Sequence, residues 1–464
     1  MPKSLPVIQE PASSLNKDGS RNFVHPADVK GRFTTRRWIT FAVLLLIYVA
    51  LPFIEVGGRP AVFLDVARRR FYLFGAAFNA QDFWLVFFLL SGMALVLFIV
   101  TTLWGRVWCG YACPQTVFLE GLYRRVERLL EGPRNQRMRR NAAPMSFDKA
   151  WRKGLKHLFF LALSLLLSHV FLSYFVSLPS LAQMVRRSPA EHPEAFAWMA
   201  ATTGLLYFNF AWFREQLCLI ICPYGRLQST LTDADTLVIG YDKKRGEPRG
   251  KRSKRSTEER GDCVDCKRCV VVCPTGIDIR NGLQMECIGC AACVDACDAI
   301  MTKLGRPTGL VRYDSLNGFE GKKKRFWRPR LAIYVLALIL WSVGSYFAFS
   351  SHEPYEANLL RAPGGAPFTV EDGVVRNTLQ VHLVNKTDEP QRYHLRGLAD
   401  DAGLEYQIPI ADVELPPGGD RHLPVFVELP RESLRPGLLV RVEVQPEGAG
   451  DPKVVEARFL GPGA

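Results

Sequence analysis

The chain contains twelve cysteines, and their spacing divides them into two groups that could do different chemistry. Eight of them form two runs of the type C-x2-C-x2-C-x3-C, which begin at Cys263 and Cys287. The other four form two C-x3-C-P motifs, the first motif at Cys109–Pro114 and the second motif at Cys218–Pro223. Thiolates are soft donors that select Cu(I), zinc or iron–sulfur centres, so both groups are candidate metal ligands.

The two runs predict two [4Fe–4S] clusters, because in this pattern the fourth cysteine of each run ligates the cluster of the other run. The first cluster is then assigned to Cys263, Cys266, Cys269 and Cys297. The second is assigned to Cys287, Cys290, Cys293 and Cys273. The segment resembles an eight-iron ferredoxin domain of α+β fold, whereas zinc knuckles or disulfides would require longer gaps between C-x2-C pairs or an oxidising compartment. The second run departs from the ferredoxin pattern at one position, because Asp298 follows its last cysteine where the first run has Pro274. This difference affects the local turn and leaves the ligands intact.

Apolar residues gather in five blocks, each near the ~20 residues that span a bilayer. The blocks cover residues 38–56, 83–103, 155–178, 196–221 and 331–349. The second and fifth contain no Asp, Glu, Lys or Arg. We therefore predict a helical membrane bundle of five spans.

The orientation of the spans follows from the basic residues between them. Residues 124–153 carry a dense run of Arg and Lys, which places this segment in the cytoplasm under the positive-inside rule. The N-terminus and the cluster region then lie inside, in the reducing compartment that iron–sulfur proteins require. Arg59 and Arg68–Arg70 fall on the opposite side and argue against this orientation. The loops assigned to the cytoplasm nevertheless contain more Lys and Arg residues.

These observations divide the chain into five expected parts. They are a cytoplasmic N-terminal tail (1–37), a four-helix membrane part with both C-x3-C-P motifs (38–225), a cytoplasmic basic linker with the two-cluster domain (226–329), a fifth membrane helix (330–350) and a periplasmic domain (351–464). The tail is too long and too polar to be the first region of a cleaved signal peptide, so the first span is expected to be retained.

In each C-x3-C-P motif the two cysteines share a helix face, and the proline is expected to end the helix near Cys113 or Cys222. The thiols would then lie at the negative end of a helix dipole, which disfavours a thiolate unless a cation compensates. A bound metal, Arg106 or Arg226 would provide that charge. The alternative is that these cysteines are small buried hydrophobic residues. Because each motif ends a helical hairpin, we expect a parallel repeat that brings both to the surface facing the clusters.

The C-terminal part has a different composition. Residues 351–464 contain neither Cys nor Met, and 18 acidic residues stand against 11 Lys and Arg. Alternating segments at 378–385, 421–428 and 438–444, separated by turn residues, predict an antiparallel all-β sandwich of Ig-like type. His382 and His394 are symmetric about Asp388, so a hairpin there would make them a cross-strand pair.

Several segments together resemble the CcoG family, also called FixG or RdxA. They are residues 70–75, 81–84, 108–116, 214–228 and 241–250, and the resemblance extends from about residue 32 to the C-terminus. Related proteins with C-x3-C-P motifs and ferredoxin domains include the NapH and NosR electron-transfer subunits. The resemblance implies a bacterial inner-membrane accessory protein for assembly of cbb3-type cytochrome c oxidase, with Cu(II) reduction to Cu(I) as its activity.

We therefore expect an iron–sulfur cupric reductase in which Cys109, Cys113, Cys218 and Cys222 bind copper. Its expected partners are the lipid bilayer, oxidase assembly factors and a copper chaperone. The basic stretch 243–260 is explained by anionic lipid, so no nucleic acid is expected. A quinol-linked subunit of the NapH type and a non-catalytic, redox-sensing assembly scaffold stay open as alternatives, as do the electron donor and a homo-oligomeric state.

Overall fold

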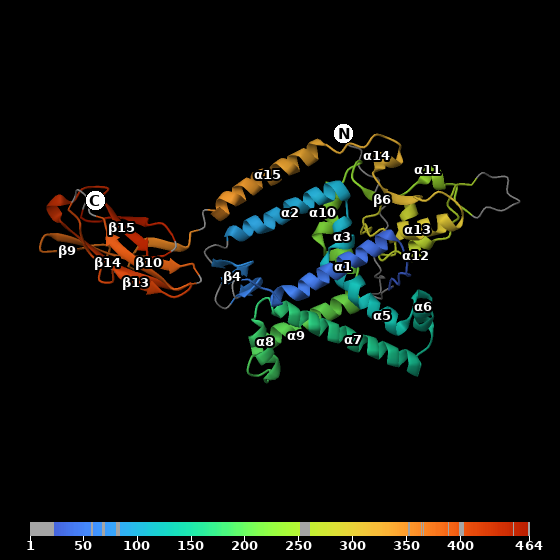
Figure 1. Ribbon diagram of the computed structural model, residues 1–464, viewed down its shortest axis with the longest axis horizontal. Coiled ribbons are helices and arrows are strands. Elements are labelled where there is room, and N and C mark those ends of the chain that lie inside the picture. The colour runs from blue at the N-terminus through green and yellow to red at the C-terminus, as the bar shows by residue number, and fades with distance from the viewer. Residues whose placement is uncertain are drawn as a thin grey trace. The chain divides into compact units, whose positions relative to one another are not determined.

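The computed structural model in Figure 1 describes residues 23–462 except 57–58, 67–69, 80–83, 251–259, 351–352, 363, 365, 388, 399–402 and 449. Most of the expected N-terminal tail and half of the basic linker lie outside the described residues. The chain forms two compact units. One contains Met1–Phe63 and Phe88–Ser342, and the other contains Leu64–Phe87 and Val343–Ala464.

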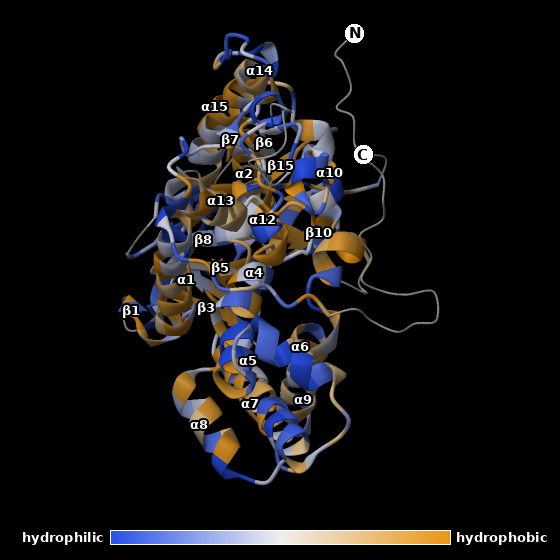
Figure 2. Ribbon diagram, turned by 90° about the vertical axis from the view of Figure 1, so that its right-hand side faces the viewer, coloured by the Kyte–Doolittle hydropathy of each residue, from blue (hydrophilic) through white to orange (hydrophobic). Residues whose placement is uncertain are grey.

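Within the described residues, four helices are long and apolar enough to cross a membrane. They are α1 (Arg32–Ala50, extended by a short 3-10 turn to Phe53), α2 (Trp84–Trp104), α7 (Phe147–Leu172) and α15 (Pro329–Ser350). Large apolar side chains of α15 are exposed, Ile333 at 63% and Leu340 at 64%. Figure 2 contrasts this hydrophobic helix with the hydrophilic α5 (Arg124–Glu131) and α6 (Arg134–Ala142). Exposed apolar surface of this extent requires lipid, so the protein is a membrane protein.

The fourth apolar block is not one regular α-helix. It consists of the 16-residue α9 (Pro193–Phe208), a π-helical turn over Asn209–Phe213, a break at Arg214 and a second π-helical turn over Leu217–Ile221. Arg214 has a φ of 52°, a conformation that interrupts any α-helix. A count of five spans therefore remains a prediction.

The first helix begins at Arg32, earlier than the expected Trp38. Its free backbone N–H groups are capped by a residue far away in the sequence, since the Asp295 carboxylate accepts from the amides of Phe33 and Thr34 at 3.3 and 2.7 Å. A Cβ on Gly31 would lie 2.3 Å from the Asp295 side chain, so glycine is required at this close approach. The cluster region thus caps the first membrane helix.

Membrane helices α2 and α15 pack through small residues. The Trp341 indole N–H of α15 donates to the Ser91 hydroxyl of α2 at 2.8 Å. A Cβ on the neighbouring Gly92 would lie 2.4 Å from the Trp341 ring, so glycine provides the space for the indole.

The cluster region combines short helices with one small sheet. Strand β6 (Val238–Tyr241) pairs antiparallel with β7 (Val311–Asp314). The helices are α11 (Lys243–Gly246), α12 (Arg268–Val271), α13 (Ala292–Lys303) and α14 (Leu316–Phe319). Asp298 lies inside α13 and accepts from the Gly309 amide at 2.8 Å. Asp298 stands at the position of the second run that Pro274 occupies in the first run. Helix α13 therefore continues through this position, whereas α12 ends before Pro274.

The second unit contains the predicted all-β, Ig-like sandwich. One sheet has the order β12 (Glu405–Gln407), β14 (Asp420–Pro430), β10 (Val374–Asn385), β8 (Tyr355–Arg361), with β9 (Thr369–Glu371) also on β10. The other has the order β13 (Asp412–Leu415), β11 (Gln391–Gly397), β15 (Leu439–Pro446), β16 (Lys453–Arg458). Alternate inward residues such as Val381, Leu423 and Val442 are fully buried between the sheets.

The same unit includes part of the connection between the first two apolar blocks. Strands β4 (Arg70–Leu73) and β5 (Ala76–Asn79) form a hairpin, and the Arg70 guanidinium donates to the Pro417 carbonyl at 2.7 Å. Arg70 is one of the basic residues that argued against the expected orientation, and this contact gives its charge a structural role.

The predicted pairing of His382 with His394 is wrong. Strands β10 and β11 belong to different sheets, because the chain crosses the sandwich after Asn385 instead of turning back on itself. His382 lies opposite His422 of β14, and His394 lies opposite Asp412 of β13.

Candidate iron–sulfur and thiol site

The eight cysteines of the two runs line two small cavities. The first cavity is lined by Cys263, Cys266, Cys269 and Cys297, together with apolar residues such as Leu310. The second cavity is lined by Cys287, Cys290, Cys293 and Cys273, together with Ile239, Ile277 and Ile288. Cys269 lines both, so the two cavities are adjacent. In each cavity three cysteines of one run meet the fourth cysteine of the other.

The two runs also share an unusual backbone. Asp265 and Lys267 of the first run have φ values of 52° and 55°, and Gly289 and Ala291 at the equivalent positions of the second have 67° and 59°. Left-handed residues that alternate with cysteines turn successive N–H groups to one side and form a cradle for an anionic group. The sequence pattern did not reveal this feature, because three of the four residues are not glycine.

The chemistry of the cavities fits iron–sulfur clusters. None of the twelve cysteines, all of which lie among the described residues, forms a disulfide bond. Burial raises the pKa of Cys287 and of Cys297 to about 12, and that of Cys269 to about 11. Free thiolates would therefore be unstable here, whereas the iron of a cluster supplies the positive charge that a thiolate needs. The residues present thus suit the group that their spacing predicts.

The two C-x3-C-P motifs follow the same structural plan. In the first, Gly105 with a φ of 57° ends α2, and α3 (Val107–Tyr111) carries Cys109. In the second, Arg214 with a φ of 52° plays the part of Gly105, and the turn Leu217–Ile221 carries Cys218. Gly105 and Arg214 each precede the first cysteine of their motif by four residues. The two motifs thus share a local backbone plan, while the parallel repeat of whole hairpins stays a prediction.

A helical segment ends near the second cysteine of each motif, as expected, since α3 ends at Tyr111 and the turn Leu217–Ile221 is capped by Cys222. The expectation missed that a second helix starts at the same place. Each proline begins a new helix, α4 (Pro114–Phe118) after Cys113 and α10 (Pro223–Leu231) after Cys222, so both cysteines are N-cap residues. The reason is that proline fits the first position of a helix as well as it ends one. The Thr116 amide donates to the Cys113 carbonyl at 3.0 Å. The backbone amides of Gln115 and Thr116 oppose the rise in the pKa of Cys113 that burial causes.

Polar side chains join the two motifs. The Gln228 amide of α10 donates to the Cys109 thiol at 3.4 Å. The Gln115 amide, two residues after Cys113, donates to the Arg214 carbonyl at 2.8 Å. Burial raises the pKa of Cys109 to about 11, and the Cys113 thiol adds to this effect. Cys218 is close enough to the other three thiols to interact with them electrostatically.

Of the two cations considered from the sequence, Arg106 lies at the site and Arg226 is exposed. The Arg106 guanidinium donates to the carbonyls of Gly225 and Cys287 at 3.0 and 3.4 Å, and its charge favours the Cys109 thiolate. It therefore connects the second motif to the second cavity.

The first motif touches the second cluster run directly. A Cβ on Gly110 would lie 2.7 Å from the Ile288 carbonyl oxygen and 3.0 Å from the backbone nitrogen of Cys290. Arg37 of α1 holds this segment through a 2.9 Å hydrogen bond to the Gly110 carbonyl. The thiol pairs and the cysteines of the second cavity are thus neighbours in one unit.

A buried ion-pair network supports this arrangement. Arg124 bonds the carbonyl of Pro274 at 3.2 Å and the Glu215 carboxylate at 3.2 Å. Glu127 accepts from Arg214, and it lies 3.4 Å from Arg137. These side chains are almost fully buried and connect the second motif to the end of the first cluster run. They were missed because charge patterning along the sequence indicated only a basic cytoplasmic segment.

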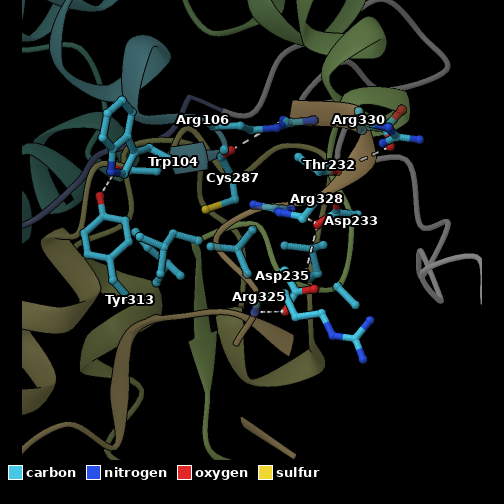
Figure 3. A pocket seen from close by; sticks show the side chains of 18 of the residues that line it. Trp104, Arg106, Thr232, Asp233, Asp235, Cys287, Tyr313, Arg325, Arg328 and Arg330 are labelled. Carbon is cyan, nitrogen blue, oxygen red and sulfur yellow. Dashed lines mark hydrogen bonds and ion pairs between the residues drawn. The ribbon is translucent and has the colours of Figure 1, made fainter. Parts of the chain in front are cut away.

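A larger cavity of about 740 Å³ lies beside the second cluster run. Figure 3 shows that Trp104, Arg106, Arg328 and Cys287 line it. The Arg328 side chain is 9% exposed and pairs with Asp233, and its Nε atom has no hydrogen-bond partner. The cavity combines apolar walls with a few polar groups, as small-molecule sites do.

Comparison with known proteins identifies the family. The profile of a 4Fe–4S dicluster domain matches residues 213–316, a 4Fe–4S binding domain matches 85–133, and the IG-like fold at the C-terminus of FixG matches 346–462. Protein RdxA of Cereibacter sphaeroides is 35% identical over 95% of this chain and 98% of its own length. The chain belongs to the FixG/RdxA family.

A second relative agrees with this assignment. The nitrogen fixation protein FixG of Rhizobium meliloti is 35% identical to this FixG-family chain, over 89% of the chain and 87% of the relative. A crystal structure of a FixG-related protein from Vibrio parahaemolyticus is 21% identical, covers 24% of this chain and 97% of its own, and has a TM-score of 0.20. The matched domains and the four apolar helices make the chain an iron–sulfur membrane protein with an Ig-like C-terminal domain.

Proposed function

We propose that this protein is a membrane-bound reductase that passes electrons from two [4Fe–4S] clusters to Cu(II) at the C-x3-C-P thiols. Cys263, Cys266, Cys269 and Cys297 would hold one cluster, and Cys287, Cys290, Cys293 and Cys273 the other. When bound, such clusters supply one-electron transfer. The observation that carries the proposal is the backbone contact of Gly110 with Ile288 and Cys290, because it brings the first motif to the second cavity.

Exposure suggests a direction for the electrons. Cys266 of the first cavity is exposed, whereas Cys290 of the second is buried beside the first motif. An external donor would approach the first cavity. The electron would then pass to the second cavity on the side of Cys269, which lines both cavities. The electron would leave at Cys109 and its neighbours.

The thiols suit copper as a substrate. Each Cu(II) takes up one electron and becomes Cu(I), which soft thiolates bind well. Cysteines must lose their protons to bind the ion, and these protons pass to solvent. The helix amides at Cys113 and the Arg106 guanidinium favour the deprotonated form. Among the described residues, no three of the thiols lie as close together as a compact three-ligand site requires. We therefore propose that one or two thiolates coordinate the copper ion at a time.

The biological setting is part of the proposal. The N-terminus and the cluster region would be cytoplasmic and the sandwich periplasmic in a bacterial inner membrane. Cu(I) would leave to a copper chaperone and serve the assembly of a cbb3-type oxidase. Support comes from family membership and from the basic segment 124–153.

The double variant Cys109→Ala/Cys218→Ala tests the reductase. Each motif loses one sulfur while all eight cluster cysteines remain, so the iron–sulfur absorption should survive. Dithionite-reduced variant protein should no longer reduce Cu(II), which is measured by trapping Cu(I) with a chromogenic chelator. Thr230→Ala, an exposed residue of α10, serves as the control and should retain wild-type activity.

Full Cu(II) reduction by the double variant would refute the role of the motifs and would mean that copper takes electrons directly from the cluster near exposed Cys266. A non-catalytic scaffold predicts a different result in cells. It would support oxidase assembly equally well with and without Cys109 and Cys218, whereas a reductase would not.

A second candidate function is quinol-linked electron transfer, with the motif cysteines holding another redox centre. The cavity beside Cys287 favours it, as does the match of a 4Fe–4S binding domain to residues 85–133. A quinol would be oxidised to the quinone, with one electron going to each cluster and two protons going to water. Cluster reduction by a short-chain quinol, lost in Trp104→Ala, would support this function, and no reduction by quinol would reject it.

A further inference from the structure

The solvent face of the sandwich carries two histidines and one carboxylate in contact. His382 on β10 lies directly opposite His422 on β14, and Asp420 precedes His422 by two residues on the same face. The two imidazole rings stack with their centroids 4.3 Å apart and their planes 10° from parallel. The His382 Nε2 atom lies 3.2 Å from an Asp420 carboxylate oxygen.

These three residues have the geometry of a metal site. One potential ligand atom from each lies within 4.8 Å of the others. Within the part of the chain that the structure describes, this is the only group of three or more His, Cys, Asp or Glu residues that meets this condition. The His382 side chain is 21% exposed and that of Asp420 is 63% exposed, so an ion from solvent can reach them.

The strands below hold the three residues in place. Strands β10 and β14 pair in continuous register from Val374–Pro430 to Val384–Asp420. The residues adjacent to the histidines along each strand, Leu383 and Leu423, point inward and are fully buried. Sites on paired strands with buried support are more precise than sites on loops, so the ligands are preorganised.

The surroundings leave the ligands available. On the other side of His382, strand β8 presents Asn358, whose amide bonds Glu356 at 3.0 Å. The Lys386 amine pairs with the same Glu356 at 3.3 Å. Two imidazoles and one carboxylate suit divalent first-row transition ions, which bind nitrogen and oxygen sets in the order that peaks at Cu(II). The sandwich has no Cys or Met, so it offers no soft site for Cu(I).

We propose that His382, His422 and Asp420 form a binding site for a divalent transition-metal ion, with Cu(II) bound most tightly. This site lies in the unit that does not contain the cluster cysteines. The proposal does not depend on the reductase function.

The sandwich also supplies a matched control. His394 on β11 bonds Asp412 on β13 at 2.7 Å, which is again a histidine and an aspartate on neighbouring strands. It faces Gln445 on its other side and has no second histidine. His394→Gln should therefore leave metal binding unchanged.

The experiment uses full-length protein in which Cys109, Cys113, Cys218 and Cys222 are replaced by Ala, so that these thiols bind no added metal. Cu(II) is titrated into the oxidised protein and followed by electron paramagnetic resonance. We expect one bound Cu(II) with nitrogen couplings from two imidazoles. His422→Gln and His382→Gln should each leave one imidazole and weaken binding at least about tenfold.

Thermal unfolding separates loss of ligands from loss of fold. Bound Cu(II) should raise the unfolding midpoint of the starting protein and of His394→Gln, but not that of His422→Gln, although all should unfold alike without metal. The exposed variant Asp420→Asn tests the third ligand without removing an imidazole. Equal Cu(II) affinity in the starting protein and in His422→Gln, or loss of binding in His394→Gln, would overturn the proposal.

Discussion

Gly110 of the first motif and Cys290 of the second cluster run are in backbone contact, with only 3.0 Å between the Cys290 nitrogen and the place where a Cβ of residue 110 would lie. The neighbouring Ile288 carbonyl is closer still at 2.7 Å. No side chain fits between these segments without moving the backbone. The contact depends on glycine, and in the proposed reductase it is the place where electrons would pass between the two groups of cysteines.

Gly110→Ala should therefore slow electron transfer from the clusters to copper severalfold and leave the cluster spectrum intact, since it separates the segments without removing a ligand. Stopped-flow oxidation of the reduced protein by Cu(II) measures this rate. Gly204→Ala in α9 is the control, because its Cβ would meet nothing within 4 Å. A wild-type rate in Gly110→Ala would show that this contact is not the route.

Crossed ligation predicts which cluster each fourth cysteine supports. Cys273→Ser should damage the cluster in the cavity with Cys287, and Cys297→Ser the one in the cavity with Cys263. Each variant should retain one cluster, as counted by iron content and by electron paramagnetic resonance of the reduced protein. If Cys273→Ser instead removes the cluster of Cys263, each run holds its own cluster and the crossed assignment fails.

The proposed orientation predicts the activity of fused reporters. Alkaline phosphatase, which works only in the periplasm, should be active when fused after Ser350 at the end of α15. It should be inactive after Gly250 in the basic linker. The reverse pattern would place the clusters in the periplasm and would reject the proposed topology.

The buried network predicts how stability depends on pH. Burial alone would raise the pKa of Glu127, but Arg214, Lys156 and Arg137 hold it at about 2, below its ordinary 4.5. The ionised carboxylate therefore stabilises the fold above pH 4.5, and this contribution, on the order of 3 kcal/mol, is lost as the pH falls through 2.

Glu127→Gln should lower the thermal unfolding midpoint at pH 7, because it leaves Arg214 buried without its anion. It should also make the midpoint less sensitive to pH between 4.5 and 2. Asp148→Asn is the control, since Asp148 is 61% exposed in its ion pair with Arg152 and such surface pairs contribute little. Equal midpoints of wild type and Glu127→Gln at pH 7 would contradict the role of the network.

The sequence alone determined features that local patterns carry. Cysteine spacing separated the two groups of thiols, because ligation of [4Fe–4S] clusters requires cysteines at a characteristic spacing along the chain. Long apolar blocks identified α1, α2, α7 and α15, since a bilayer requires a minimum length. Alternation of apolar and polar residues identified the strands β10, β14 and β15, because successive side chains of a strand face opposite sides.

Only the tertiary structure decided which distant residues meet. The cap of α1 by Asp295 and the break at Arg214 depend on partners far along the chain, so local spacing could not reveal them. The place of Cys113 and Cys222, each directly before a proline, was ambiguous, because proline both ends one helix and begins another. The structure shows that both cysteines cap the start of a helix. His382 met His422 instead of His394 because strand order, which is set by packing of the whole sandwich, decides cross-strand neighbours.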